Sequence, residues 1–208
     1  MKIALIGATG YVGNKLLAEA LSRGHELTAI TKETGHAPHP HANLEFVQVD
    51  ATDVKALSGA IRGHDLVISA FNPGLDADGS GTRAIIDGVK RAGIGRFLTV
   101  GGAGTLLLPS GQRVVDQPDF PAEWKEGSLR TAAFFETLQK EKELDWVFLS
   151  PAAMLVPGER TGRYRIGKDH LLTDAKGESR ISLEDFASAM LDEAEQPRHH
   201  SERFTVAY

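Results

Sequence analysis

Three glycines stand at a regular spacing in the stretch IALIGATGYVGNK, residues 3–15. Gly7, Gly10 and Gly13 follow a short apolar run that predicts a strand, and they precede a pattern typical of a helix. Glycine allows a tight turn at the first position, close approach of a pyrophosphate at the second, and close packing of the helix at the third. The helix N-terminus would offer its N–H groups to phosphates. The stretch predicts a dinucleotide-binding loop, with a glycine turn that holds no ligand as the alternative.

The end of the second predicted strand, residues 25–31, bears on which dinucleotide is bound. An NAD site usually has an acid there, which accepts a hydrogen bond from the ribose 2′-hydroxyl. Here Thr31 and Lys32 occupy these positions, and Glu33 is displaced toward the loop. Lys32 could pair with a 2′-phosphate, so the sequence favours NADP(H), with NAD(H) possible. The alternative for Lys32 is a solvated surface lysine.

Small and polar residues follow the later strands, at the edge where sheets of this kind bind ligands. Asp50 ends the third strand and is placed to accept from an adenine amino group, or else to cap a helix over 53–60. Small residues at the other ends leave room for a flat nicotinamide. The positions concerned are Ala70, Phe71 and Asn72 after the fourth strand, Gly101 and Gly102 after the fifth, and Pro151 after the sixth.

Two tyrosines match the Tyr-x-x-x-Lys spacing by which short-chain dehydrogenases transfer a proton. Tyr11 and Lys15 lie at the phosphate loop, at the wrong end of a dinucleotide for this role. Tyr164 and Lys168 lie in a glycine-rich segment that we expect to be extended, which would place them about 13 Å apart. We therefore expect neither pair to act as the proton donor.

The helix before the sixth strand, expected over residues 128–142, is the usual place for such a tyrosine, and it has none. Ser128 could take the tyrosine's place, but we expect it to be the N-cap of this helix. His170 is a second candidate proton donor without an evident partner. The catalytic residues thus stay unassigned, and the sequence favours direct hydride transfer to an acceptor with its own electron sink, such as a flavin or quinone.

Strands alternate with helices along the chain, which predicts a parallel sheet. We expect an α/β fold, a Rossmann-type doubly wound parallel sheet with helices on both faces. Residues 1–208 would form one domain, in which residues 152–182 make a small substrate-side lobe with one or two short strands. Ser182 and Asp185 begin a last helix in a capping-box pattern.

Composition and net charge limit the kinds of partner and the cellular compartment that we expect for this protein. The net charge of −5 gives no electrostatic case for nucleic acid or an anionic membrane, and no apolar run is long enough to span one. Without cysteine, the chain has no disulfide or thiolate chemistry. We expect a cytoplasmic monomer or homodimer whose partner is a small-molecule acceptor. No metal site is expected, because the loop histidines His36, His39 and His41 lie at uneven spacing without acids.

Arg160, Arg163 and Arg165 form a basic cluster in the expected lobe. Such a cluster could face an anionic substrate such as a flavin phosphate. The alternative is a solvated face that Glu159 and Asp169 balance.

Several stretches together resemble the NADH-flavin reductase family of bacterial NAD(P)H-binding proteins, within the atypical short-chain dehydrogenases. They are GATGYVG, VISAFNPG, RFLTVGGAGTL, DFPAEWK, DWVFLSPAAM, PGERTGRYRIG and RFTVAY. The family is similar in outline to NmrA-like proteins and to the flavin/biliverdin reductase B group, and many members are named NAD-dependent epimerase/dehydratase. The resemblance implies a Rossmann fold that binds NAD(P)H.

The resemblance also implies roles for individual residues. Gly7, Thr9, Gly10, Tyr11 and Val12 would line the pyrophosphate, Ala70, Phe71 and Asn72 the ribose, and Gly101, Gly102 and Pro151 the nicotinamide. The family name suggests NADH, whereas the charge of Lys32 suggests NADPH. Three functions remain open: an NAD(P)H-dependent reductase, a non-catalytic NmrA-like sensor, and an epimerase or dehydratase, which the missing Tyr-x-x-x-Lys disfavours.

Overall fold

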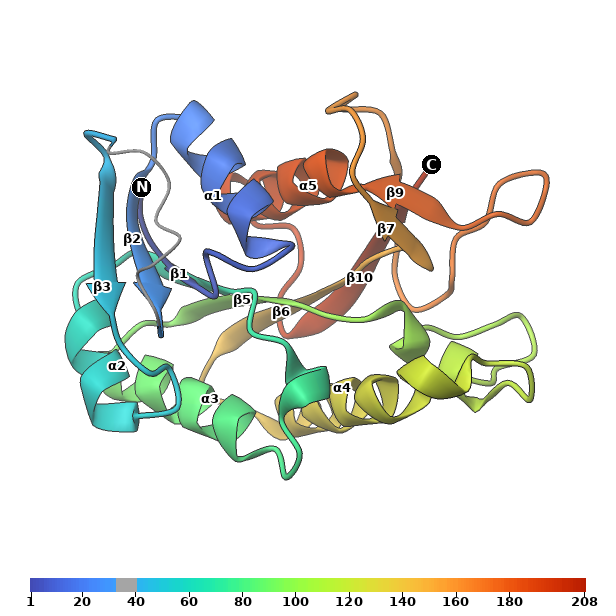
Figure 1. The fold of residues 1–208 in the computed structure, drawn as a ribbon, viewed down its shortest axis with the longest axis horizontal. Coiled ribbons are helices and arrows are strands. Elements are labelled where there is room, and N and C mark those ends of the chain that lie inside the picture. Colours follow the sequence, from blue (N-terminus) through green and yellow to red (C-terminus); the bar gives the residue numbers. More distant parts are fainter. Residues whose placement is uncertain (33–40) are drawn as a thin grey trace.

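The computed structural model describes residues 1–32 and 41–208. In this part of the chain an eight-stranded sheet has the order β3-β2-β1-β4-β5-β6-β10-β8, whose first six strands are those of a doubly wound dinucleotide-binding sheet (Figure 1). All neighbours are parallel except β8, which is antiparallel to β10. The strands are β1 (Lys2–Ile6), β2 (Glu26–Thr31), β3 (Leu44–Gln48), β4 (Leu66–Ser69), β5 (Arg96–Val100), β6 (Asp145–Ser150), β8 (Arg165–Gly167) and β10 (Glu202–Ala207).

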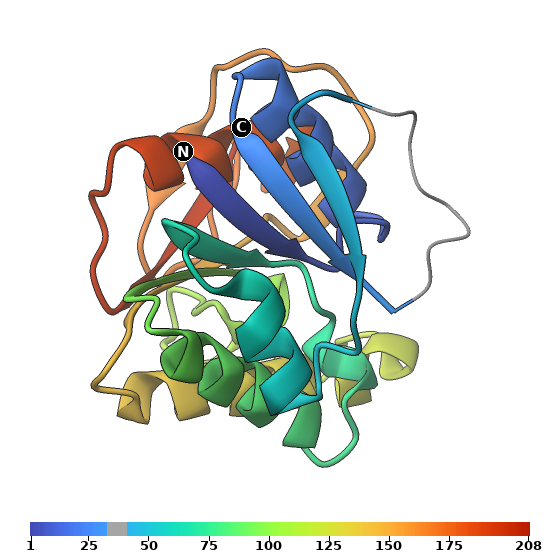
Figure 2. The ribbon, with the colours of Figure 1, turned by 90° about the vertical axis from the view of Figure 1, so that its left-hand side faces the viewer.

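Helices cover both faces of the sheet, as predicted. Helices α1 (Gly13–Ser22) and α5 (Leu183–Glu195) pack on one face (Figure 1). Helices α2 (Val54–Ile61), α3 (Ser80–Ala92) and α4 (Ala122–Lys140) cover the other, as the turned view in Figure 2 also shows. No helix in the described ranges is both long and apolar enough to cross a membrane.

Two apolar cores follow from this layering, one on each face. On one side Leu16 of α1 and Phe186 of α5 pack over the central strands, and on the other Ile85 of α3 and Phe134 of α4 do the same. Strand β4 is buried along its whole length, as expected for a strand covered on both faces. The two cores thus pack the strands from both sides up to the edge where they end.

Helix α4 begins at Ala122, six residues before the predicted start, with Pro121 at its N-cap. Gly127 lies inside the helix and does not end it. The 3-10 turn η1 (Pro73–Leu75) packs against Gly127, and a Cβ added to Gly127 would lie 3.5 Å from the Cα of Gly74. Ser128 therefore lies inside the helix, and its predicted role as an N-cap is wrong. The helix is longer because proline is favoured at a helix start, whereas a single glycine inside a helix costs only about 1 kcal/mol.

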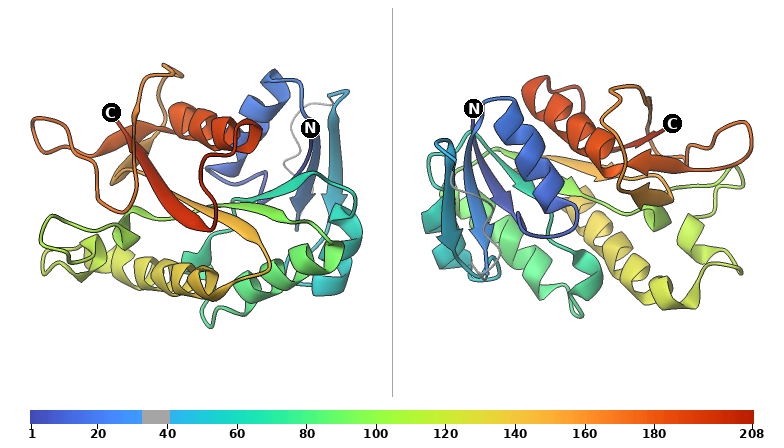
Figure 3. Two further views of the ribbon diagram at one scale, coloured as in Figure 1. Left: turned by 180° about the vertical axis from the view of Figure 1, so that it is seen from behind. Right: turned by 45° about the horizontal axis from the view of Figure 1, so that its top comes forward.

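Residues 152–182 contain three short strands, where one or two were predicted. Strand β7 (Met154–Val156) pairs with β9 (Arg180–Ser182), and β8 joins the main sheet beside β10 (Figure 3). The helix start predicted at Ser182 is present, because the Ser182 hydroxyl oxygen accepts a hydrogen bond from the Asp185 N–H at 3.0 Å.

Candidate functional site

The glycine loop between β1 and α1 leaves little room for a side chain at its three glycine positions. Gly7 has a positive φ of 75°, and a Cβ there would lie 2.9 Å from the carbonyl oxygen of Ala70. A Cβ on Gly13 would lie only 1.9 Å from the carbonyl oxygen of Gly7, because α1 starts directly against the turn. At Gly10 the nearest atom would be 3.3 Å away. The glycine pattern in the sequence thus reflects steric limits of the loop.

Helix α1 presents an uncapped N-terminus at this loop. Its N-cap residue Val12 makes no side-chain hydrogen bond, and its first turn contains no acidic side chain. A helix start of this kind favours an anion, so the loop and helix together suit a diphosphate. Tyr11, just before the helix, donates a hydrogen bond to the Leu155 carbonyl oxygen at 3.4 Å and so reaches across to β7.

A cavity of about 390 Å³ opens beside the loop, and we call it the glycine-loop cavity. It lies at the ends of β1 to β4. Its lining contains nine predicted positions, Gly7, Thr9, Gly10, Thr31, Lys32, Asp50, Ala70, Phe71 and Asn72, together with Ile6, Ile30, Val49, Ala51, Thr52 and Leu75. The predicted positions Tyr11, Val12 and Gly13 lie on the loop and the helix start but are not in this lining.

One end of the glycine-loop cavity is charged. The Lys32 Nζ lies 3.1 Å from the Asp50 carboxylate, which also accepts hydrogen bonds from the hydroxyl and the N–H of Thr52 at 2.7 and 3.0 Å. The Thr52 bonds and Lys32 together lower the pKa of Asp50 to about 2. Asp53 caps α2, so the alternative that Asp50 is the cap is wrong. This end of the cavity therefore contains a cation, Lys32, and an anion, Asp50, which are paired with each other.

Thr31 lines the glycine-loop cavity, but its hydroxyl does not face it. The side chain is buried, and the hydroxyl oxygen is inaccessible to solvent and has no hydrogen-bond partner among residues 1–32 and 41–208. A buried hydroxyl without a partner costs about 1–3 kcal/mol.

Phe71 and Asn72 shape the middle of the groove. The Phe71 ring packs against α3, where a Cβ on Gly81 would meet it at 3.0 Å. The Asn72 side-chain oxygen accepts a hydrogen bond from the Gly74 N–H at 2.9 Å and fixes the turn after β4. Both side chains are therefore held in place by the protein itself.

A second cavity, of about 360 Å³, lies past the ends of β5 and β6 and against α4; we call it the Trp124 cavity. Trp124 is 64% exposed at its mouth, and Phe120 and Pro121 stand beside it. None of its 14 described lining residues has a side chain that titrates near neutral pH. They are Gly102, Ala103, Gly104, Thr105, Val114, Phe120, Pro121, Trp124, Ser128, Thr131, Pro151, Ala152, Ala153 and Leu155.

The hydroxyls in the Trp124 cavity are mostly engaged with the backbone. Thr105 donates to the Gly102 carbonyl oxygen at 2.7 Å, and Thr131 donates to the Gly127 carbonyl oxygen at 2.9 Å. Ser128 faces Gly104, where a Cβ would contact the Ser128 Cβ at 3.0 Å. Of the predicted positions, Gly102, Pro151 and Ser128 line this cavity, while Gly101 is tucked against the Phe148 ring and does not.

Arg203 of β10 supports the wall of the Trp124 cavity from behind. Its buried guanidinium donates to the Thr105 carbonyl oxygen at 2.6 Å and pairs with Asp169 at 2.6 Å. It also lies 4.5 Å from the ring centre of Phe135 on α4. The Arg203 side chain thus connects the wall of the Trp124 cavity to strand β10 and to helix α4.

Neither tyrosine–lysine pair is arranged for proton transfer, as expected from the sequence. Tyr164 donates to the Asp192 carboxylate at 2.6 Å, and burial together with this bond raises the pKa of Tyr164. Lys168 and Lys15 each pair with a glutamate. Tyr11 lies before α1 rather than one helical turn from Lys15 on it.

His170 is exposed and lies opposite Leu107 in an isolated bridge. It is not in the lining of the Trp124 cavity, and its role as a proton donor stays a prediction. The sequence does not reveal the pairing with Leu107, which joins segments 63 residues apart.

The basic cluster does not converge on a ligand. Arg160 pairs with Glu19 at 2.8 Å, and Arg165 donates to the carbonyl oxygens of Thr173 and Tyr208. None of Arg160, Arg163 and Arg165 lines the Trp124 cavity. The predicted balancing acid Asp169 pairs with Arg203 instead.

Glu33, His36 and His39 lie outside the described residues. The remaining loop histidine, His41, accepts a hydrogen bond from the Asn43 N–H at 3.1 Å. Within residues 1–32 and 41–208, no three His, Cys, Asp or Glu side chains are grouped to hold a metal ion.

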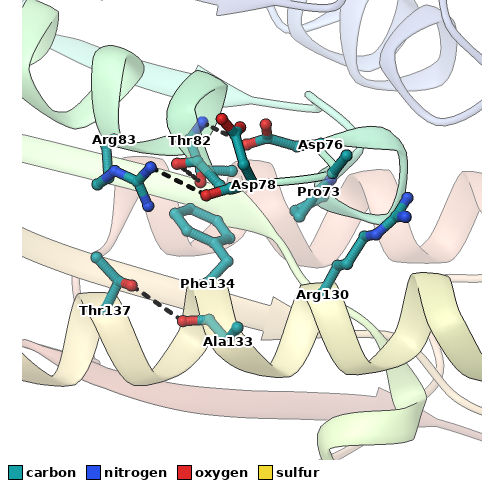
Figure 4. A pocket seen from close by; sticks show the side chains of 11 residues that line it. Pro73, Asp76, Asp78, Thr82, Arg83, Arg130, Ala133, Phe134 and Thr137 are labelled. Atoms are coloured by element: carbon teal, nitrogen blue, oxygen red, sulfur yellow. Dashed lines mark hydrogen bonds between the residues drawn. The ribbon is translucent and has the colours of Figure 1, made fainter.

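A third cavity, of about 220 Å³, lies between α3 and α4, and its polar groups serve the fold (Figure 4). The Asp76 carboxylate accepts from the N–H groups of Gly81 and Thr82 and so caps α3. Arg83 donates to the Asp78 carbonyl oxygen at 2.9 Å, and Arg130 donates to that of Gly74 at 3.0 Å. These groups find their partners within the protein.

The sequence analysis missed the aromatic wall of the Trp124 cavity and Thr52 beside Asp50. The sequence does contain a pattern that predicts this wall. The stretch FPAEW, residues 120–124, has an aromatic residue at each end and a proline at a place typical of a helix start. Thr52 has no comparable signal, because its contact with Asp50 arises from a local turn.

Known proteins share the sequence pattern and the fold of this chain. A crystal structure from Bacteroides thetaiotaomicron, provisionally named an epimerase, is 48% identical, has a TM-score of 0.96, and aligns over 100% of this chain and 96% of its own. One from Streptococcus pneumoniae, provisionally named an NADH-flavin reductase, is 33% identical, with a TM-score of 0.86 and coverage of 100% and 99%. The uncharacterized protein YwnB of Bacillus subtilis is 40% identical over 99% of this chain and 98% of its own length. The model of the NAD(P)H-binding family matches residues 7–197, and the chain belongs to this family.

Proposed function

We propose that this protein is an NAD(P)H-dependent reductase whose acceptor is a planar ring with its own electron sink, such as a flavin or a quinone. The observation that carries the proposal is the Trp124 cavity, whose described lining offers aromatic and small side chains but no titratable one. A carbonyl substrate would need a proton donor at this place. A flavin or quinone needs only geometry, since a solvent proton can complete its reduction.

The glycine-loop cavity fits a pyridine dinucleotide. Gly7 and Gly10 line the cavity without a Cβ, and the uncapped start of α1 follows directly on the same loop. Gly7, Gly10 and the start of α1 would hold the diphosphate, and Lys32 would pair with a 2′-phosphate. Gly102 and Pro151 would border the nicotinamide.

Bound NAD(P)H would supply two electrons as a hydride, and a solvent proton would complete the reduction, leaving NAD(P)+ and the two-electron-reduced acceptor. The chain's own residues orient the acceptor and exclude water. Trp124 and Phe120 offer ring faces for stacking, which is worth about 0.5–1.5 kcal/mol for an aromatic pair. Thr105 and Thr131 have their hydroxyls turned to the backbone, which leaves Ser128 as the lining residue whose hydroxyl could contact a ligand.

A non-catalytic sensor is the competing function, because a pocket without a proton donor also suits a protein that only binds the dinucleotide. Turnover separates the two. We expect purified protein to oxidise NADPH when riboflavin or a soluble quinone is added. Tight dinucleotide binding without turnover on a broad panel of acceptors would establish the sensor instead.

An epimerase or dehydratase is the third candidate. The Bacteroides relative carries an epimerase name. Helix α4, however, has no tyrosine in this chain, and Tyr164 is bonded to Asp192. A tyrosine within hydrogen-bond reach of the Trp124 cavity in a crystal structure of a ternary complex would revive this candidate.

A cofactor titration tests the preference for NADP(H). Lys32→Ala should weaken NADPH binding about tenfold, the value of one charge-assisted contact, and leave NADH binding within twofold. Lys55→Ala, which removes an exposed lysine from α2 outside the cavity lining, is the matched control. Equal losses for both dinucleotides, or no loss, would reject the pairing of Lys32 with a 2′-phosphate.

A further inference from the structure

Three side-chain hydroxyls line the Trp124 cavity, those of Thr105, Ser128 and Thr131. Thr105 and Thr131 donate to backbone carbonyl oxygens at 2.7 and 2.9 Å, so their protons are already used. The Ser128 hydroxyl has no hydrogen-bond partner among residues 1–32 and 41–208, and unlike the hydroxyl of Thr31 it is not enclosed by protein. Ser128 therefore presents an accessible and unpartnered hydroxyl to the cavity.

Helix α4 places Ser128 on the side that faces this cavity. Trp124 lies four residues before Ser128 and Thr131 three residues after it, so the three lining side chains share one face of the helix. The 3-10 turn η2 (Ala103–Thr105) packs against α4, and a Cβ added to Gly104 would lie 3.2 Å from the Ser128 Oγ. Because Gly104 has no side chain, there is space beside the Ser128 Oγ.

The surroundings of this hydroxyl are largely apolar. Val114, Phe120 and Leu155 contribute hydrocarbon surface to the same cavity, and none of its described lining residues is charged. Small-molecule sites of this kind hold ligands mainly by apolar contact, with a few polar groups that fix the orientation of the ligand. An unpartnered hydroxyl in such a place favours a hydrogen-bond acceptor at the edge of an otherwise apolar ring. A ring carbonyl oxygen is an acceptor of this kind.

We infer that the Ser128 hydroxyl donates a hydrogen bond to a ring carbonyl oxygen of the electron acceptor. The site would thus take rings that bear a carbonyl, as quinones and flavins do, in preference to planar acceptors without one. This inference rests on the proposed function, and it deepens it by naming the chemical group of the acceptor that the protein recognises and the residue that recognises it.

The same hydrogen bond would assist the reaction. A hydride carries two electrons, so the acceptor ring gains a negative charge as the C4–H bond of the nicotinamide breaks and the bond to the acceptor forms. Conjugation places much of this charge on the carbonyl oxygen, and a donor aimed at that oxygen stabilises the transition state more than the ground state. Ser128 keeps its own proton, and a solvent proton then neutralises the reduced ring.

Two planar acceptors that differ in this group test the inference with the full chain. Ser128→Ala should lower kcat/KM for a soluble 1,4-naphthoquinone about tenfold at saturating NADPH, the value of one hydrogen bond, with most of the loss in kcat. N-methylphenazinium accepts a hydride but has no carbonyl. Its kcat/KM, corrected for the direct reaction with NADPH, should therefore stay within about twofold, as should the Kd for NADPH.

Thr137→Ala is the matched control for this variant. It removes another hydroxyl of α4, one that donates to the Ala133 carbonyl oxygen at 3.0 Å and does not line the Trp124 cavity. It should leave the kinetic constants for both acceptors as they are.

A binding measurement reports the contact without turnover. With NADP+ in place of NADPH no hydride is available, and infrared difference spectroscopy can follow the carbonyl band of a naphthoquinone that is isotope-labelled at its carbonyl carbons. A hydrogen bond weakens the carbonyl bond, so the band of the bound quinone should lie at a lower wavenumber in the wild type than in Ser128→Ala.

The outcomes separate the two claims. Equal reduction of the quinone by wild type and Ser128→Ala, or equal losses for both acceptors, would overturn the contact with Ser128 and leave the reductase standing. A carbonyl band that depends on Ser128, without reduction of any acceptor, would overturn the reductase and support the contact. Identical bands in the two proteins would overturn the contact.

Discussion

The two larger cavities at the strand ends of this protein are built differently. The glycine-loop cavity adjoins a backbone loop whose glycines admit no Cβ, and an uncapped helix start follows that loop. The Trp124 cavity is formed by side chains that come from the ends of β5 and β6, from the segment around Val114, and from the start of α4. The first is charged at one end, where Lys32 and Asp50 lie, while the second has no titratable group in its described lining.

The two cavities therefore suit different ligands. A backbone cradle can bind the part of a ligand that never changes, such as a diphosphate. An apolar slot suits a second ligand held by stacking and by exclusion of water. Variants in the first cavity should affect dinucleotide binding, and variants at the aromatic wall of the second should mainly affect the acceptor.

The largest expected effect comes from Gly13→Ala. A Cβ there would lie 1.9 Å from the Gly7 carbonyl oxygen, so the loop must move. Such overpacking should cost about 3 kcal/mol of folding stability and weaken NADPH binding at least a hundredfold. Thermal unfolding and a fluorescence titration with NADPH measure the two effects.

Gly59 provides the control for this variant. It lies in α2, and a Cβ added there would have nothing within 4 Å, so Gly59→Ala should keep NADPH binding and stabilise the helix by up to about 1 kcal/mol. If Gly13→Ala bound NADPH like the wild type, the steric account of the loop would be wrong.

Trp124→Ala should show the opposite pattern. The KM for a flavin or quinone should rise about tenfold, the value of a lost aromatic stack, while the Kd for NADPH should change less than twofold. Leu129→Ala removes another exposed apolar side chain of α4 that does not line the cavity and should leave both constants unchanged. Loss of NADPH binding in Trp124→Ala would show that the two cavities are not separate in function.

Arg203→Met should act through the wall that Arg203 holds. Without the guanidinium, the Thr105 carbonyl oxygen loses its donor, and the expected loss of stability is about 1–3 kcal/mol. We expect kcat to fall a few-fold with the acceptor KM and the NADPH Kd less affected, because the wall shifts rather than disappears. Lys168→Ala, which breaks an exposed pair with Glu202, should cost less than about 1 kcal/mol and leave kcat as it is. Equal kcat values in wild type and Arg203→Met would contradict a positioning role.

The smallest effect concerns pH and the charged end of the glycine-loop cavity. The pKa of Asp50 is about 2, so Asp50 keeps its charge throughout the range from pH 5 to 8. A 2′-phosphate has its second pKa near 6 and loses charge below it. NADPH affinity should therefore fall about threefold as the pH drops from 8 to 5, while NADH affinity stays constant. A parallel fall for both dinucleotides would place the titrating group on the protein.

The sequence predicted the fold and the backbone-built cavity well, for a physical reason. Strand and helix periodicity gave the doubly wound order, and Gly7, Gly10 and Gly13 are required by the local backbone wherever such a loop occurs. Local requirements of this kind are written in consecutive residues, so they can be recognised without a structure.

The side-chain-built cavity could not be predicted in the same way. Trp124 reaches it because α4 begins at Ala122, directly after Pro121, and His170 lies opposite Leu107, outside the lining. Arg203 stands behind the wall although it is 98 residues from Thr105 in the chain. Each of these depends on contacts between distant segments, which spacing alone does not reveal.

The most direct test of the central claim is the pH dependence of a single turnover, with NADPH-loaded protein mixed with excess of a soluble quinone. Because no titratable side chain lines the Trp124 cavity within the described chain, the rate constant should be flat between pH 6 and 9. A bell-shaped or sigmoidal profile whose inflection disappears when one protein side chain is replaced would reveal a proton donor and contradict the account.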